Sequence, residues 1–83
     1  MSDFIKNLKT KLEKSVAPMG YTVQLRTSKS LRIMKDKDTV MTVTDRGEMV
    51  EVVVEGKTYT YDKWYTSADQ LATVITNFFA QRQ

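Results

Sequence analysis

The 83-residue sequence contains no cysteine and no histidine, and these two absences exclude much of the chemistry that small proteins perform. Without a thiol there is no disulfide, no thiolate ligand for zinc and no cysteine nucleophile. Without an imidazole, the common catalytic triads and the histidine-containing metal sites are excluded as well. We therefore expect no catalytic residue, no metal site and no cofactor, and a protein that is not an enzyme.

Long apolar runs and flexible linkers are missing too. No apolar run exceeds three residues, as at 52–54, which excludes a membrane-spanning helix and the hydrophobic region of a secretory signal. One proline and three glycines leave no material for a long flexible linker. We expect a single domain over residues 1–83, with no membrane partner and a cytoplasmic location.

What the sequence does contain is an uneven distribution of charge within a net charge of +3. Residues 1–37 carry nine Lys or Arg and three acidic residues, a net of +6, whereas residues 38–83 carry four and seven, a net of −3. This asymmetry can steer a polyanion or an acidic protein to one side of the molecule. An ordinary solvated surface with uneven charge is the alternative explanation.

Apolar residues at helical spacing predict one helix near each end of the chain. The Ser-Asp pair at positions 2 and 3 supplies N-cap residues for the first helix, residues 2–16, and Pro18 follows its end. Ser67 and Gln70 form the S-x-x-Q capping-box pattern at the start of the second helix, residues 67–81.

Between the helices, β-branched and aromatic residues alternate with polar ones and turn residues recur at short intervals, which predicts strands. Because the connections are short, an antiparallel meander is the expected topology. The predicted fold class is α+β, with both helices packed on one face of the sheet and the other face open. The five predicted strands comprise residues 21–26, 30–35, 39–45, 48–55 and 58–62.

The hairpin loops predict which strand residues face each other. Two-residue loops at positions 46–47 and 56–57 close the third and fourth hairpins, and three-residue loops close the first two. On this register nearly every large apolar side chain lies on the face that the helices cover, and a one-residue slip would scatter them. The expected pairs include Val23–Ile33, Ile33–Met41, Val43–Val50 and Val54–Tyr59.

Four aromatic residues late in the chain allow two interpretations. Aromatic side chains beside basic residues can stack on the bases of single-stranded nucleic acid. The register instead puts Tyr59 and Tyr61 under the helices, and it leaves Trp64 and Tyr65 to fill the joint between the sheet and the second helix. Core packing is therefore the interpretation that we prefer for the two strand tyrosines.

The open face of the sheet is the candidate interaction surface. A short apolar row of Met34, Val40 and Val53 lies there among threonines and charged residues. This predicts an interaction or regulatory module that binds a protein partner, or a second copy of itself, through the open face or an edge strand. The candidate protein-binding residues are Met34, Val40, Thr42, Met49 and Val53.

The basic amino-terminal half supports an alternative hypothesis, a nucleic-acid-binding module. Its Lys and Arg side chains would contact phosphates from one flank of the first helix and from the neighbouring strands. Lysines also form the ordinary polar border of an amphipathic helix. The candidate residues are Lys6, Lys9, Lys11, Lys14, Arg26, Lys29 and Arg32.

The order helix, five strands, helix resembles the frataxin architecture, in which two terminal helices cover one face of an antiparallel sheet. Frataxins carry acidic residues on the first helix, where this sequence has lysines, so the resemblance implies a topology and not an iron-handling role. The double-stranded-RNA-binding domain is a second likeness. It has fewer strands and a lysine-rich start to its last helix, where this sequence reads Ser67-Ala68-Asp69-Gln70.

Overall fold

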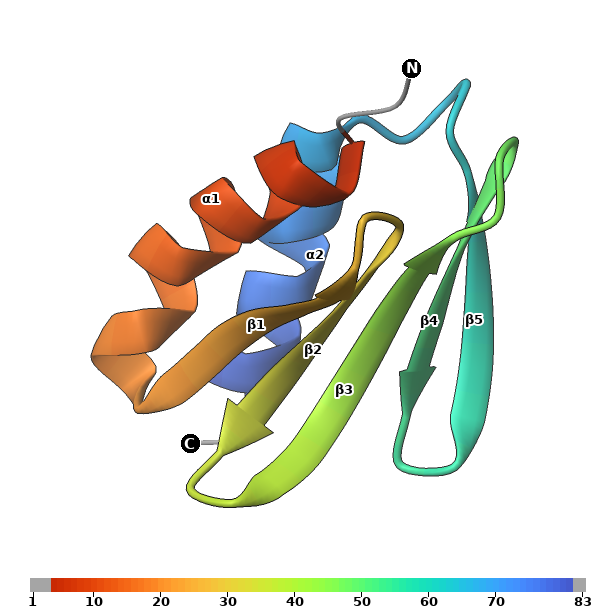
Figure 1. The fold of residues 1–83 in the computed structure, drawn as a ribbon. Helices are drawn as coiled ribbons and strands as arrows, with labels where there is room; N and C mark the ends of the chain where they lie inside the picture. The colour runs from red at the N-terminus through yellow and green to blue at the C-terminus, as the bar shows by residue number, and fades with distance from the viewer. Residues whose placement is uncertain (1–3, 82–83) are drawn as a thin grey trace.

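The computed structural model describes residues 4–81 as a helix, a five-stranded antiparallel meander and a second helix (Figure 1). The predicted α+β class and order of elements are confirmed, and the predicted strand ends and both ends of the second helix lie within one residue of the observed ones. The strand order is β1-β2-β3-β4-β5, so β1 and β5 are the edges of the sheet. The elements are α1 (Phe4–Val16), the 3₁₀ helix η1 (Ala17–Met19), β1 (Tyr21–Thr27), β2 (Ser30–Lys35), β3 (Asp38–Asp45), β4 (Met49–Val54), β5 (Lys57–Asp62) and α2 (Ala68–Ala80).

The helix ends follow the local signals of the sequence. At the start of α2 the hydroxyl of Ser67 accepts from the Gln70 N–H at 3.2 Å, and the Gln70 side-chain oxygen accepts from the Ser67 N–H at 2.9 Å. This is the complete capping box. After α1, the 3₁₀ helix contains Pro18 and ends at Met19, and its C-cap is Gly20, whose φ of +96° suits a glycine. The N-cap expected at positions 2 and 3 lies outside the described residues.

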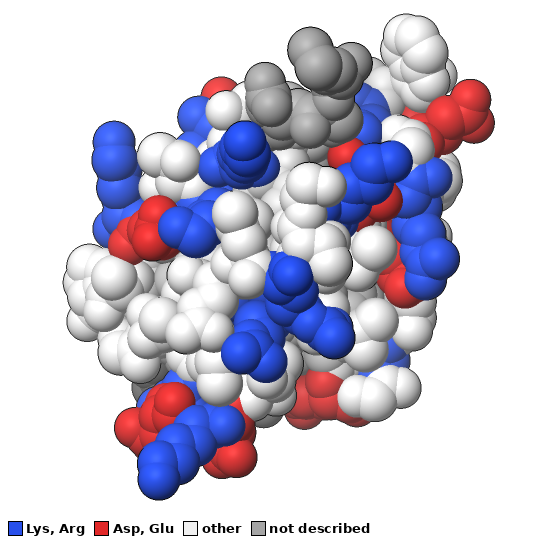
Figure 2. All heavy atoms as spheres, viewed as in Figure 1, with Lys and Arg blue, Asp and Glu red and all other residues white. Residues whose placement is uncertain are grey.

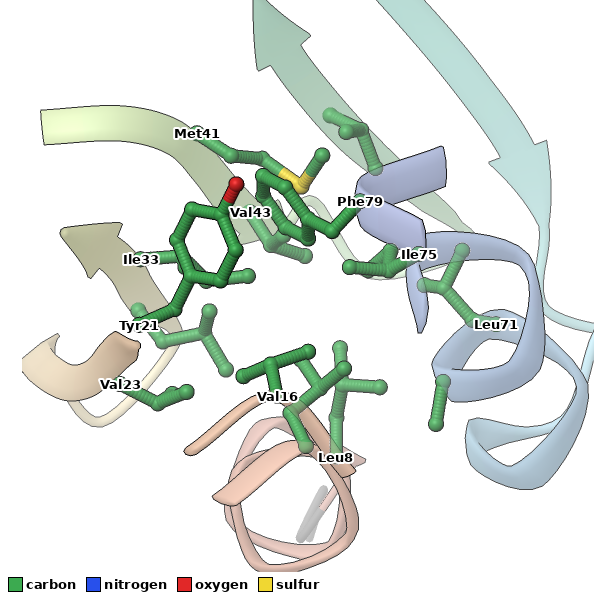
Figure 3. Packing of buried hydrophobic residues seen from close by; sticks show 14 of the residues in the cluster. Leu8, Val16, Tyr21, Val23, Ile33, Met41, Val43, Leu71, Ile75 and Phe79 are labelled. Carbon is green, nitrogen blue, oxygen red and sulfur yellow. The ribbon is translucent and has the colours of Figure 1, made fainter. Parts of the chain in front are cut away.

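One apolar cluster fills the space between the helices and the sheet. Figure 3 shows Leu8 and Val16 of α1 directed toward the same interior as Ile75 and Phe79 of α2. The rings of Tyr21 and Phe79 lie 4.3 Å apart between centroids. The helical stripes and the alternating strand residues thus meet in one core. Its most deeply buried members are Ile5, Leu8, Leu12, Val16, Leu31, Ile33, Val43, Val50, Leu71, Ile75 and Phe79.

The first two hairpins have the expected pairing up to a β-bulge near each turn, where the predicted three-residue loops are wrong, and the last two hairpins are displaced by two residues. Val23–Ile33 and Ile33–Met41 are paired as predicted. The predicted Val43–Val50 and Val54–Tyr59 pairs are wrong, because Val52 is the residue that faces both Val43 and Tyr59. Every one of these side chains nevertheless keeps its predicted face.

The turns explain the displacement. Gly47 has φ +99° and begins a turn with Glu48, one residue later than expected. Glu55 and Gly56 have φ values of +53° and +76°, as in a type I′ turn, one residue earlier than expected. Moving a two-residue turn by one position changes the register by two. Since strand side chains alternate with a period of two, the partners change and the faces do not.

A β-bulge changes the position of Val40. The register of the β2–β3 pair shifts between Ile33 and Met34, which makes Val40 the extra residue of β3. Val40 is half-buried against the core cluster, and it lines a cavity together with Tyr21 and Phe79 of the helix-covered side. Its predicted place in the apolar row of the open face is therefore wrong.

The helix layer lies toward the β1 side of the sheet. α1 contacts β1, β2, β3 and α2, and β5 lies on the side of the sheet away from α1 (Figure 1). Tyr59 faces the helix side but remains 44% exposed, so its predicted burial under the helices is wrong. Trp64 and Tyr65 are each 83% exposed and do not fill the joint between sheet and helix. The backbone of this connection is held instead by Asp62, which accepts from three N–H groups at residues 64–66.

Candidate functional site

The open face is largely polar, and it carries the predicted apolar row without Val40. Val53 is 36% exposed, while Met34, Thr42 and Met49 are half-buried. Thr42 lies opposite Val53, but Met49 lies at the other end of β4. Because Val40 has turned toward the core, the structure brings together only part of the predicted set.

The lysines of α1 lie on two opposite flanks of the helix. Lys11 forms an ion pair with Asp69 of α2, so its flank faces α2. Lys9 belongs to the other flank and pairs with Glu13 at 3.0 Å. The positive charge of the helix is thus divided and partly neutralised. Lys6 and Lys9 lie on one flank of the helix, and Lys11 and Lys14 lie on the other.

The basic residues of the first hairpin are better exposed. Arg26 lies at the β1 bulge and Lys29 in the loop, and no ion pair within residues 4–81 involves either. Arg32 is half-buried and donates to the Gln24 side-chain oxygen at 3.1 and 3.3 Å. Figure 2 shows Lys and Arg atoms in separate groups, several with Asp or Glu atoms beside them. Lys and Arg atoms therefore form no single continuous surface on the face that this figure shows.

The β5 edge is more open to a further strand than the β1 edge. Pairing between β4 and β5 runs without interruption from Lys57 to Asp62, and residues 58–61 are uncharged. The β1 edge is interrupted by a bulge between Leu25 and Thr27. Proteins protect sheet edges with bulges, charges, proline or a covering element. Along β5 none of these devices interrupts residues 58–61 in the structure described.

The ladder pattern identifies the backbone groups of β5 that point outward. A two-residue turn joins β4 to β5, so Val54–Lys57 is the hydrogen-bonded closing pair and the pattern alternates from there. Tyr59 therefore directs its N–H and C=O groups toward β4. Thr58 and Thr60 direct theirs away from the sheet, where an added strand would bind them.

An apolar cavity of 210 Å³ lies beside β5 on the helix side. Tyr59 of β5 and Val74 of α2 stand at its margin, each 44% exposed. We call this cavity the groove. Its exposed margin makes it accessible from the same side as the outward backbone groups. The lining residues are Met41, Val52, Val54, Tyr59, Tyr61, Val74, Ile75 and Phe78.

A second cavity, of 430 Å³, adjoins the first. Both cavities are lined by Val54 and Phe78, and the second is also lined by Tyr21, Lys35 and Glu55. The Lys35 ammonium lies 5.6 Å from the centroid of the Tyr21 ring. A groove that is mainly apolar beside β5 thus becomes more polar toward the starts of β1 and β3.

Sequence reasoning named an edge strand as one possible site but did not find the groove, because it put Tyr59 and Tyr61 under the helices. The sequence offered one signal, which concerns exposed apolar surface at the end of β5 and not the groove itself. The adjacent aromatic residues Trp64 and Tyr65 stand between a strand and the capping Ser67, outside either apolar period. Large aromatics placed in such a turn indicate exposed apolar surface near the end of β5.

The described residues contain no group of three or more His, Cys, Asp or Glu side chains that could hold a metal ion. Each buried side-chain nitrogen or oxygen in this part of the chain has a hydrogen-bond partner. Within residues 4–81, neither helix combines the length and the apolar character needed to cross a membrane.

Comparison of the chain with protein families, with curated proteins and with solved structures gives no match. The resemblance to frataxins is thus limited to the order of elements.

Proposed function

We propose that this protein is a small non-enzymatic protein-binding module that takes an extended segment of another polypeptide as a further strand along β5. The observation that carries the proposal is the combination of a regular, uncovered edge strand with an apolar groove beside it. Backbone hydrogen bonds to Thr58 and Thr60 supply affinity in this mode of recognition, and the groove selects side chains.

The geometry also describes the segment that binds. Successive side chains of an added strand alternate between the groove side and the open face. On the groove side they meet Tyr59 and Val74, whereas on the open face they meet Thr58 and Thr60. The segment is therefore expected to be apolar at every second residue and polar between.

A selection of displayed random peptides on the immobilised protein tests the proposal. Enriched peptides are expected to alternate apolar and polar residues. Their affinity for the Thr60→Pro and Val74→Glu variants should be lower than for the wild type by a factor of about ten or more. Thr60→Pro removes one outward N–H and leaves the ladder to β4 intact. Val53→Glu, on the open face, is the matched control for Val74→Glu and should bind normally. Selected peptides without alternation, or unaffected by Thr60→Pro, would overturn the proposal.

The same protein is titrated with labelled single-stranded and duplex nucleic acid across a salt series. We expect no salt-sensitive binding that depends on Arg26 and Lys29. Micromolar binding that falls steeply with salt, and that is lost in the Arg26→Gln and Lys29→Gln double variant, would assign the interaction to the first hairpin. That outcome would replace the protein-binding proposal.

A further inference from the structure

We infer that the polypeptide bound at this edge is a second copy of the same chain, joined β5 to β5 in antiparallel orientation about a twofold axis at Tyr59. The inference rests on the proposed function, since it names the occupant of the same edge. Three features of the molecule support it: the charge pattern of β5, the positions of the outward backbone groups of β5 and the difference between the two sheet edges.

The charge pattern of β5 is complementary to itself. The strand carries Lys57 at its start and Asp62 at its end, with four uncharged residues between them. An antiparallel copy brings the lysine end of each strand to the aspartate end of the other. A parallel copy would bring like charges together at both ends. Charge complementarity therefore favours the antiparallel arrangement.

The outward backbone groups define the register. Pairing Thr58 with Thr60 of the second copy joins those groups in both directions and puts the two Tyr59 side chains opposite each other on the axis. In this register Lys57 faces Tyr61 of the second copy. A register with Thr60 opposite itself would put Lys57 opposite Lys63, and it would not bring the two Tyr59 side chains together.

The groove lies on the correct side for such a contact. A twofold axis perpendicular to the sheet keeps both helix layers on one side, so the groove margins at Val74 face each other across the tyrosines. Tyr59 and Val74, now each 44% exposed, lose contact with water when the copies join. Cross-strand aromatic pairs and Thr–Thr pairs add to the stability of the junction.

The opposite edge explains why association stops at two copies. β1 carries the bulge between Leu25 and Thr27, exposes Arg26 and lies alongside α1 (Figure 1). Each chain therefore offers one regular edge. Two such edges joined about a twofold axis form a closed, isologous dimer with a sheet of ten strands, five from each copy.

Sedimentation equilibrium from about 1 μM to about 1 mM protein tests the inference. The wild type is expected to show a reversible monomer–dimer equilibrium. Tyr59→Lys and Tyr59→Glu should each weaken dimerisation about tenfold or more, because like charges meet on the axis. An equimolar mixture of these two variants should regain dimer, since lysine then faces glutamate. Val53→Glu should associate as the wild type does.

Each outcome decides the inference. A wild type that stays monomeric to about 1 mM overturns the second copy as occupant. In that case the peptide selection decides separately whether the edge binds another protein. A dimer insensitive to both Tyr59 variants, or a mixture that stays monomeric, also overturns the inference. An amide NMR spectrum of each variant shows whether the variant is folded, and this distinguishes a loss of association from a loss of folding. Thr60→Pro, which should dissociate the dimer, gives an independent test of the edge.

Discussion

At the scale of single residues, the buried carboxylate of Asp45 links three parts of the chain. Both of its oxygens lie 2.9 Å from the Lys63 ammonium, and one accepts from the Gly47 N–H at 2.8 Å. The same ammonium lies 5.3 Å from the centroid of the Phe4 ring. The turn after β3, the end of β5 and the start of α1 therefore meet at this ion pair. Since the Asp45 side chain is only 3% exposed, removing either charge leaves the other poorly compensated.

Asp45→Asn is accordingly expected to lower the free energy of unfolding by about 2–3 kcal/mol. The control is Glu51→Gln, which breaks an ion pair between Glu51 and a 62% exposed Arg46 in the same hairpin. Exposed pairs of this kind contribute little, so the control should change stability by less than about 0.5 kcal/mol. Urea denaturation measures both variants. Equal losses would contradict burial as the source of the effect.

At the scale of elements, the capping box should be worth more to α2 than the polar contacts along its side. Ser67→Ala removes the acceptor for one otherwise unpaired N–H and is expected to cost about 1 kcal/mol of stability. Thr73→Ala, on the exposed side of the same helix, removes only a hydroxyl that donates to the Asp69 carbonyl. Because alanine favours the helix, this control should leave stability unchanged or slightly raised. A comparable shift of the denaturation midpoint in both variants would argue against the cap.

The hairpins show why element positions were predictable while their pairing was not. The turn at Gly47 and Glu48 and the turn at Glu55 and Gly56 each lie one residue from the dipeptide that the sequence suggested. Glu55 even takes a positive φ, which non-glycine residues seldom adopt. The choice between neighbouring dipeptides depends on the packing of whole strands. Both choices put the same side chains into the core.

At the scale of the whole molecule, the lateral position of the helix layer decides where the protein can bind. α1 lies along β1, so one edge of the sheet has a helix beside it while β5 and the groove remain open. The two edges therefore differ in whether a bulge interrupts them, in whether a helix lies beside them and in the charges that they carry. This asymmetry supports both the proposed binding mode and a dimer that closes.

Residue-resolved amide hydrogen exchange follows this asymmetry directly. At low protein concentration the Thr58 and Thr60 amides should exchange fast, while Tyr59 and Tyr61, which point toward β4, should be protected. Raising the concentration should slow exchange at Thr58 and Thr60 as the dimer forms. Slowing of a different strand, with these two unaffected, would move the contact away from β5.

The elements, their order and the face of almost every strand residue, with Val40 as the exception, follow from the sequence alone. Helical and alternating periods are local, and a face survives a register change of two residues, as at Val52. The capping box at Ser67 and the absence of cysteine and histidine are equally local facts. The edge-strand part of the site was therefore predictable, as one of several possibilities.

Tertiary packing sets the partners in the last two hairpins, the inward turn of Val40 and the exposure of Tyr59 and Trp64. The partners and the turn of Val40 depend on where a turn or bulge forms among nearly equivalent positions. The exposures depend on how far the helix layer extends across the sheet. Such choices depend on small free-energy differences summed over contacts between residues distant in sequence. No local sequence pattern therefore predicts them.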